Sequence, residues 1–143
     1  MIAKIITDPN ILAQQSEDFV FGQDEWLLQD MLDTANEHKA SCAGLAAIQI
    51  GVPKRVILVR KGNDFFFLIN PTILKYDGGS YYTTEGCLSV DSTNAVRRYR
   101  SVMVGYMTKC GKKCVKTFTG YTAQIIQHEV DHLNGITIDT KAA

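Results

Sequence analysis

Apolar side chains recur at helical spacing near the start of the chain, among Asp, Glu and Gln residues. The positions that carry them are Trp26, Leu27, Met31, Leu32 and Ala35. This spacing places the apolar side chains on one face of a helix. The pattern therefore predicts an amphipathic helix over residues 23–39.

Apolar runs typical of β-strands follow this segment. Residues 55–59 and 65–69 are rich in Val, Ile, Leu and Phe, and residues 61–64 between them are polar and contain a glycine, which favours a hairpin. Residues 72–76 predict another strand. We expect the chain to turn again at Gly78-Gly79, because consecutive glycines are typical of turns.

A second hairpin and a helix are predicted in the last third of the chain. Residues 101–107 and 113–118 flank Cys110-Gly111, which favours a hairpin turn. Residues 121–133 predict a helix that ends at Asn134-Gly135, a sequence typical of helix C-termini.

The order of these elements indicates a fold class. Residues 41–51 are mostly small and apolar and contain two glycines, which favours a turn or short strand approached closely by other backbone. A helix, several strands and a final helix are typical of the α+β class. The chain has 143 residues, the length of one domain. We expect a single domain over residues 1–143, with mostly antiparallel β-sheets packed around a central helix.

Charge and composition exclude several classes of protein. Fifteen basic residues balance 15 acidic ones, so the chain has no electrostatic footprint for nucleic acid or an anionic membrane. No apolar run approaches the roughly 20 residues of a membrane span, and Asp8-Pro9 comes too early for the core of a signal peptide. We expect a cytoplasmic protein whose four cysteines are reduced, as metal ligands or core residues.

The most informative segment is Gln127-His128-Glu129-Val130-Asp131-His132. Histidines four residues apart lie on one face of a helix, so both imidazoles can reach one metal ion. A glutamate directly after the first histidine can hold a water molecule and move its proton, which is the arrangement of metal-assisted hydrolysis. A solvated helix that happens to carry two histidines is the alternative.

A catalytic metal site needs a third protein ligand and one open position. Only eleven residues follow His132, and Asp139 is the lone carboxylate among them. The third ligand should therefore lie upstream. The candidates are Cys87, Cys110, Cys114 and, more weakly, His38 and Cys42.

Two assignments of that ligand compete. In the first, Cys110 and Cys114 bind the metal together with His128 and His132, and the spacing of these four residues is close to that of a two-Cys two-His zinc finger. The spacer is one residue too long for such a finger, and its helix would lack Arg and Lys between Gly120 and Asn134. The other candidate is Cys87, whose Glu85-Gly86-Cys87-Leu88-Ser89 segment could present a thiolate and a backbone N–H to one point.

Three segments of the chain resemble the motifs of the peptide deformylase family, which are G-x-G-L-A-A-x-Q, E-G-C-L-S and H-E-x-D-H. The corresponding residues here are 42–49, 85–89 and 128–132, in the family's order. The resemblance extends from about Ile5 to Ile138 and covers most of the chain.

The resemblance implies removal of the formyl group from N-formylmethionine at the start of nascent polypeptides. It implies that Cys87, His128 and His132 hold one divalent metal ion, commonly iron(II) in the family, although zinc, nickel or cobalt can replace it. Glu129 would act first as a general base and then as a general acid.

Supporting roles carry over in the same way. The Gln49 side-chain amide and the Leu88 backbone N–H would stabilise the oxyanion. Gly44 would offer backbone hydrogen bonds to an extended peptide. Glu85 and Arg98 would form a supporting ion pair.

The remaining candidates have alternative interpretations of equal weight. Asp131 would orient the helix or a ligand, and a solvated helix charge is the alternative. Ala43, Tyr121 and Ile125 are candidates for the pocket of the methionine side chain, and ordinary core packing is the alternative for each.

The chain departs from the family pattern at two places. Cys42 replaces the first motif glycine. The chain also stops soon after His132, so we expect the family's C-terminal helix to be absent, activity to survive and ribosome docking to be doubtful. Such a short form suits a phage or an organelle-like minimal version. We expect the protein in the bacterial cytoplasm, or in the host cytoplasm if a phage encodes it. Three alternatives to a deformylase stay open. They are a metallopeptidase, a zinc-stabilised binding module that uses Cys110 and Cys114, and a catalytically dead relative.

Overall fold

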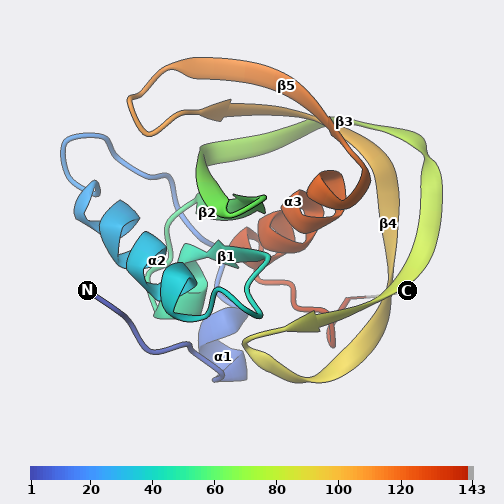
Figure 1. Cartoon of the computed structure of the whole chain (residues 1–143), viewed down its shortest axis with the longest axis horizontal. Coiled ribbons are helices and arrows are strands. Elements are labelled where there is room, and N and C mark those ends of the chain that lie inside the picture. The colour runs from blue at the N-terminus through green and yellow to red at the C-terminus, as the bar shows by residue number, and fades with distance from the viewer. Residues whose placement is uncertain (142–143) are drawn as a thin grey trace.

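A computed structural model describes residues 1–141, in which one antiparallel sheet curves around a helix (Figure 1). The sheet has five strands in the order β1-β2-β3-β4-β5. The strands are β1 Gly44–Ala46, β2 Val56–Lys61, β3 Asp64–Cys87, β4 Val90–Met107 and β5 Lys113–Thr119. The predicted α+β class with an antiparallel sheet is confirmed.

The helices are α1 Pro9–Leu12, α2 Trp26–Glu37, the 3-10 helix η1 Ala47–Ile50 and α3 Gly120–Leu133. The helices predicted over 23–39 and 121–133 are thus confirmed, with ends that differ by up to three residues. None of the helices within residues 1–141 combines the length and apolar character needed to cross a membrane.

Both predicted hairpins form. In the first hairpin, β2 pairs with β3, with Val56 opposite Ile69 at one end and Lys61 opposite Asp64 at the other. In the second, β4 pairs with β5, with Ser101 opposite Thr119 and Met107 opposite Lys113 at the two ends.

The turn predicted at Gly78-Gly79 is wrong. β3 continues through both glycines, and its register with β4 shifts between Asp77 and Ser80. The φ angles of Gly78 and Gly79 are 74° and 76°, a region that L side chains seldom adopt. The glycines therefore form a bulge that bends a long strand without reversing it.

The sequence predicted no helix or strand for residues 90–100. In the structure they form the first part of β4. They pair with the end of β3, up to Val90 opposite Cys87. The segment starts with the polar residues Asp91, Ser92, Thr93 and Asn94, three of which are exposed, so it lacks the apolar alternation of a half-buried strand. Pairing with β3 decides its conformation.

Strand β2 is buried on both faces and separates two apolar clusters. Ile57 and Val59 pack in the cluster that contains Ile126 and Val130 of α3. Val56 and Leu58 pack in the cluster that contains Leu27 and Met31 of α2. Burial on both sides explains why the strand is continuously apolar, and it fixes α3 against the sheet.

The end of α3 packs closely on the turn after α1, and this contact generates a first prediction. A Cβ at Gly135 would overlap the Ala13 carbonyl oxygen, and the φ of Gly135 is 75°. A Cβ at Gly79, which has nearly the same φ, would meet nothing within 4 Å. We expect Gly135→Ala to lower the free energy of unfolding by about 2 kcal/mol more than Gly79→Ala, because overpacking adds to the shared backbone strain. Urea unfolding of both variants measures the difference, and equal losses would contradict the close approach.

Candidate metal and catalytic site

Helix α3 and the end of β3 bring three possible metal ligands together. His128 and His132 lie one turn apart on α3, and Cys87 is the last residue of β3. One ligand atom from each of Cys87, His128 and His132 lies within 4.8 Å of the others. The Cys87 Sγ is 3.4 Å from the His132 Nε2. The three residues therefore face one point.

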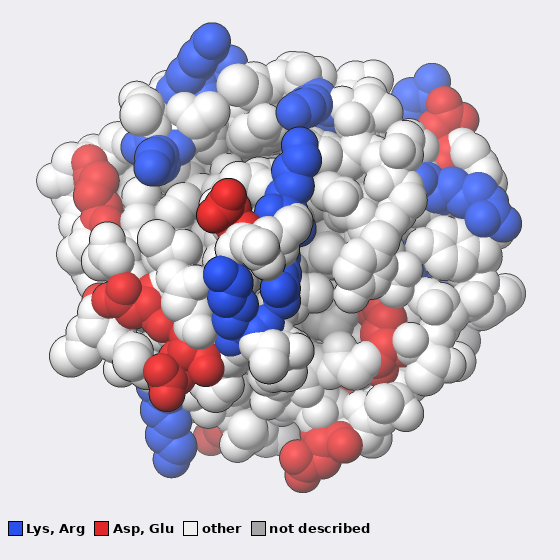
Figure 2. Space-filling model, viewed as in Figure 1, with Lys and Arg blue, Asp and Glu red and all other residues white. Residues whose placement is uncertain are grey.

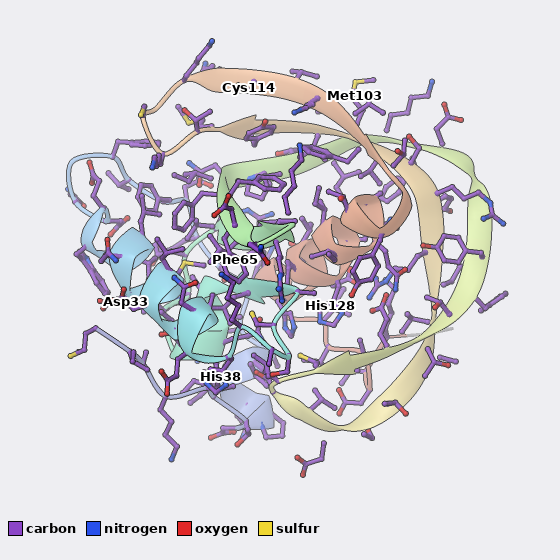
Figure 3. All side chains as sticks on the ribbon, in the orientation of Figure 1. Asp33, His38, Phe65, Met103, Cys114 and His128 are labelled. Carbon is purple, nitrogen blue, oxygen red and sulfur yellow. The ribbon has the colours of Figure 1, made fainter. Side chains whose placement is uncertain are left out.

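The side chain of His128 is held in a fixed orientation by Glu85. The His128 Nδ1 lies 2.8 Å from the Glu85 Oε1, which leaves Nε2 as the nitrogen that can face a metal. A carboxylate in this position fixes the tautomer of a ligating histidine and increases its basicity. The side chain lies between α3 and the last part of β3 (Figure 3).

Glu85 in turn forms an ion pair with Arg98, as the resemblance predicted. The Arg98 Nε and Nη2 donate to the two Glu85 oxygens at 2.9 and 2.7 Å. Arg98 Nη1 donates to Asp131 Oδ2 at 2.6 Å, and Lys141 Nζ lies 3.1 Å from the same oxygen. Asp131 is therefore part of this network on α3, and its interpretation as a solvated helix charge is wrong.

The network keeps Glu85 ionised although it is buried. Burial raises the pKa of Glu85, but the hydrogen bonds from Arg98 and His128 outweigh it and hold the pKa at about 2. The carboxylate therefore stays negative beside His128 at neutral pH.

The donor set fits a divalent transition metal. Two imidazoles and one thiolate suit iron(II) or zinc, because nitrogen and sulfur donors match these ions. Burial opposes a charge on His128, but the charge of Glu129 and hydrogen bonds to Cys87 and Glu85 raise its pKa to about 10. The surroundings of His128 therefore favour positive charge at this point.

Glu129 lies beside this point and is buried. Its side chain is 4% exposed, and its Oε1 has no hydrogen-bond partner among residues 1–141. Burial raises the pKa of Glu129 to about 7. A carboxyl group with such a pKa can both accept and donate a proton near neutral pH.

Gln49 is held with its amide nitrogen toward Cys87. The Gln49 Oε1 accepts from the Ala46 backbone N–H at 2.9 Å. The Gln49 Nε2 donates to the Ser89 Oγ at 3.1 Å and lies 3.6 Å from the Cys87 Sγ. The sequence did not single out Ser89 for this role, although it is the last residue of the motif that contains Cys87.

A cleft of about 450 Å³ opens onto these groups. All four predicted substrate-binding residues line the cleft, namely Ala43, Gly44, Tyr121 and Ile125. The predicted catalytic residues Gln49, Leu88 and Glu129 also line it, together with His128. Tyr121 is 66% exposed and lies at the rim, whereas Ile125 also packs in the core. The roles of these residues stay predictions.

Gln124 is another lining residue that the sequence analysis missed. Its Nε2 donates to Glu85 Oε2 at 2.9 Å, and its Oε1 accepts from the Tyr81 hydroxyl at 3.2 Å. The only available signal was its position one turn before His128.

The competing ligands lie elsewhere. Within residues 1–141 the possible metal group contains Cys87 but neither Cys110 nor Cys114. Cys114 lies on β5, far from His128 in the view of Figure 3, and His38 lies at the end of α2. The zinc-finger alternative is therefore unsupported.

Cys42, which replaces a motif glycine, is buried near the cleft. Its Sγ donates to the Gly44 carbonyl oxygen at 3.3 Å. Burial and the charge of Glu129 raise the pKa of Cys42 to about 12. The thiol is therefore protonated at neutral pH, and it packs as a small apolar residue.

Comparison with known proteins decides the family. The sequence model of a family described as polypeptide deformylase matches residues 2–143. The chain belongs to the polypeptide deformylase family. The deformylases are metal-dependent hydrolases that remove the N-formyl group from nascent polypeptides, and this chain is such an enzyme.

Individual deformylases are similar over nearly their whole length. A peptide deformylase of Clostridium beijerinckii is 41% identical over 138 residues, which cover 96% of this chain and 100% of the relative. Actinonin-bound class I type b peptide deformylase from Acinetobacter baumannii has a TM-score of 0.90 at 31% identity, covering 100% of this chain and 99% of that one. Peptide deformylase from Thermotoga maritima also has a TM-score of 0.90, at 28% identity, with the same coverage.

The buried network in this deformylase generates a prediction about stability. Arg98 is 1% exposed, and Arg98→Met would remove the guanidinium that pairs with both Glu85 and Asp131. We expect a loss of about 3–5 kcal/mol in the free energy of unfolding, because the buried Glu85 charge then loses its main cationic partner. The neighbouring Arg97 is exposed, and Arg97→Met should change the free energy by about 0.5 kcal/mol or less. Urea unfolding at a fixed metal concentration compares the two, and a similar loss in both would contradict the role of the network.

The space around Gly44 generates a prediction about activity. A Cβ at Gly44 would lie 2.8 Å from both Glu129 Oε2 and Ile125 Cγ2. We expect Gly44→Ala to lower kcat/KM for a formylated peptide about 100-fold, because a displacement of about 1 Å in a reacting group has an effect of this size. A Cβ at Gly86, in the same cleft, would approach only Thr93 Cγ2 at 3.9 Å. Gly86→Ala is therefore the matched control, and an equal loss in both variants would contradict the steric explanation.

Proposed function

We propose that this deformylase holds one divalent metal ion, natively iron(II), on Cys87, His128 and His132, and that Glu129 carries the proton during hydrolysis of N-formylmethionyl peptides. The observation that supports this most directly is the convergence of these three side chains beside a buried carboxylate oxygen of Glu129 that has no hydrogen-bond partner among residues 1–141. Cys87, His128 and Glu129 line one cleft. The same cleft holds the amide of Gln49.

The metal supplies Lewis-acid activation of the reacting groups when it is bound. The thiolate favours iron(II) or zinc over hard cations such as magnesium. Zinc, nickel or cobalt can replace iron in this proposal, since each accepts nitrogen and sulfur ligands.

The substrate binds in an extended conformation along β1. This strand is at one end of the sheet, so its outer side is free for backbone hydrogen bonds at Gly44, as in strand addition. The methionine side chain enters the part of the cleft lined by Ala43, Tyr121 and Ile125.

Glu129 moves one proton between the reactants. It accepts a proton from the attacking water as the water oxygen bonds to the formyl carbon. The Gln49 Nε2 and the Leu88 backbone N–H donate hydrogen bonds to the resulting oxyanion. Glu129 then gives the proton to the methionine nitrogen as the C–N bond breaks, which releases formate and a free amino terminus.

The ligands of a related structure indicate what else the cleft binds. Crystal structures of the Acinetobacter baumannii enzyme contain Met-Ala-Ser or actinonin. We propose that the cleft of this chain binds both, Met-Ala-Ser as a reaction product. The single domain, cytoplasmic location, doubtful ribosome docking and lack of direct nucleic-acid contact remain part of this proposal.

Formate release tests the function and the role of Glu129 together. Protein prepared anaerobically with iron(II), or reconstituted with nickel, should release formate from formyl-Met-Ala-Ser, whereas metal-stripped protein should not. Glu129→Ala should bind metal and fold normally but lose about 100- to 10,000-fold in kcat, because it removes only the proton carrier. Retention of activity within about tenfold would exclude Glu129 as the general acid and base.

Metal retention tests the third ligand. We expect Cys87→Ser to bind less than one equivalent of metal after dialysis, because a serine hydroxyl is a much poorer ligand for iron(II) or zinc than a thiolate. The double variant Cys110→Ser/Cys114→Ser is the control and should retain the metal. Metal analysis by mass spectrometry distinguishes them, and loss from the control alone would favour the zinc-finger arrangement.

A further inference from the structure

A second hollow, of about 640 Å³, lies where β3 and β4 separate. The pairing of these strands starts at Ile69 opposite Met107. In the register of the described strands, Asp64–Leu68 pair with β2 alone. After Met107 the chain leaves the sheet in the turn that leads to β5. Of these five residues, Phe65, Phe66 and Phe67 line the hollow, and their edge of β3 has no strand partner on this side within the described residues.

The lining of the hollow is rich in aromatic side chains from three strands. They are Phe65, Phe66, Phe67, Tyr106 and Phe118. The rings of Phe66 and Phe118 stack with their centres 6.2 Å apart, and Tyr106 lies 6.2 Å from Phe118. Contacts among the rings make this a fixed apolar surface. Phe65 lies on the β2–β3 hairpin, near the middle of the view in Figure 3.

The charged residues that line the hollow are all basic. They are Lys61, Lys109 and Lys116, and no Asp or Glu is among the lining residues. None of these lysines forms a salt bridge with any of residues 1–141. In the view of Figure 2, a run of Lys and Arg crosses the middle of the face, with one acidic side chain beside it. Because the whole chain is neutral, this concentration of positive charge is local.

We propose that this hollow binds an extended acidic peptide segment of another protein. The segment would add its backbone to the edge of β3 at Phe65–Phe67, as in other strand-addition complexes. Its apolar side chains would contact the aromatic surface, and its carboxylates would pair with Lys61, Lys109 and Lys116.

The aromatic contacts favour a peptide over single-stranded nucleic acid. Binding of bases requires ring faces that are free to stack. Phe118 is only 7% exposed, and the Lys116 Nζ lies 5.7 Å from its ring centre. The open strand edge favours a peptide over a small amphipathic acid, which has no backbone to pair with it.

A fluorescein-labelled hexapeptide of alternating Glu and Val residues tests the proposal. It is titrated into the metal-loaded enzyme with saturating Met-Ala-Ser, and anisotropy reports binding. We expect one site per chain. Lys61→Gln/Lys116→Gln should weaken binding at least about tenfold, which corresponds to two lost charge-assisted pairs. Lys4→Gln/Lys75→Gln makes the same charge change away from the hollow and should have little effect. A peptide N-methylated on alternate amides should also bind at least about tenfold more weakly, because it cannot pair along a strand.

Each other outcome overturns the proposal. Equal weakening in the two double variants would indicate non-specific attraction, and displacement by Met-Ala-Ser would assign the peptide to the catalytic cleft. Equal binding of the N-methylated peptide, or tighter binding of decanoate or an RNA hexamer, would exclude strand addition by an acidic peptide. The proposal does not rest on the deformylase reaction, since formate release should be unchanged in Lys61→Gln/Lys116→Gln.

Discussion

The arrangement of the site depends on one buried cation, the guanidinium of Arg98. This side chain extends from β4 to Glu85 on β3 and to Asp131 on α3. Two consecutive strands and the last helix are thus joined by charge-assisted hydrogen bonds in a region of low dielectric, where such bonds are strong and costly to break. Through Glu85 the same cation fixes the orientation of His128. Electrostatic stability and ligand geometry therefore have a common origin.

Close packing provides the second constraint. Strand β2 is buried between α2 and α3, so α3 cannot shift without disturbing both apolar clusters. The glycine at position 44 lets β1 approach Glu129 and Ile125 more closely than any other residue would allow. The cleft is therefore bounded by rigid elements, which suits a reaction that requires accurate placement of a small formyl group.

The cleft also contains two glutamates, Glu85 and Glu129, whose pKa values are shifted in opposite directions. Glu85 remains ionised because Arg98 and His128 surround it, whereas burial without such partners raises the pKa of Glu129. Two glutamates near the same histidine thus differ in protonation behaviour. Glu85 holds the orientation of His128 and Glu129 is suited to proton transfer, and the difference arises from their surroundings alone.

The sequence determined features that depend on local geometry. The four-residue spacing of His128 and His132 placed both on one helix face, and apolar periodicity gave both hairpins and the helices α2 and α3. Three short motifs gave the family. Only the tertiary structure decided that β3 continues through Gly78 and Gly79, that Glu85 holds His128, and that Ser89 orients Gln49. These contacts join residues up to 43 positions apart, and no local propensity encodes them. They form because burial removes water from polar groups, which must then find partners wherever the fold brings them together.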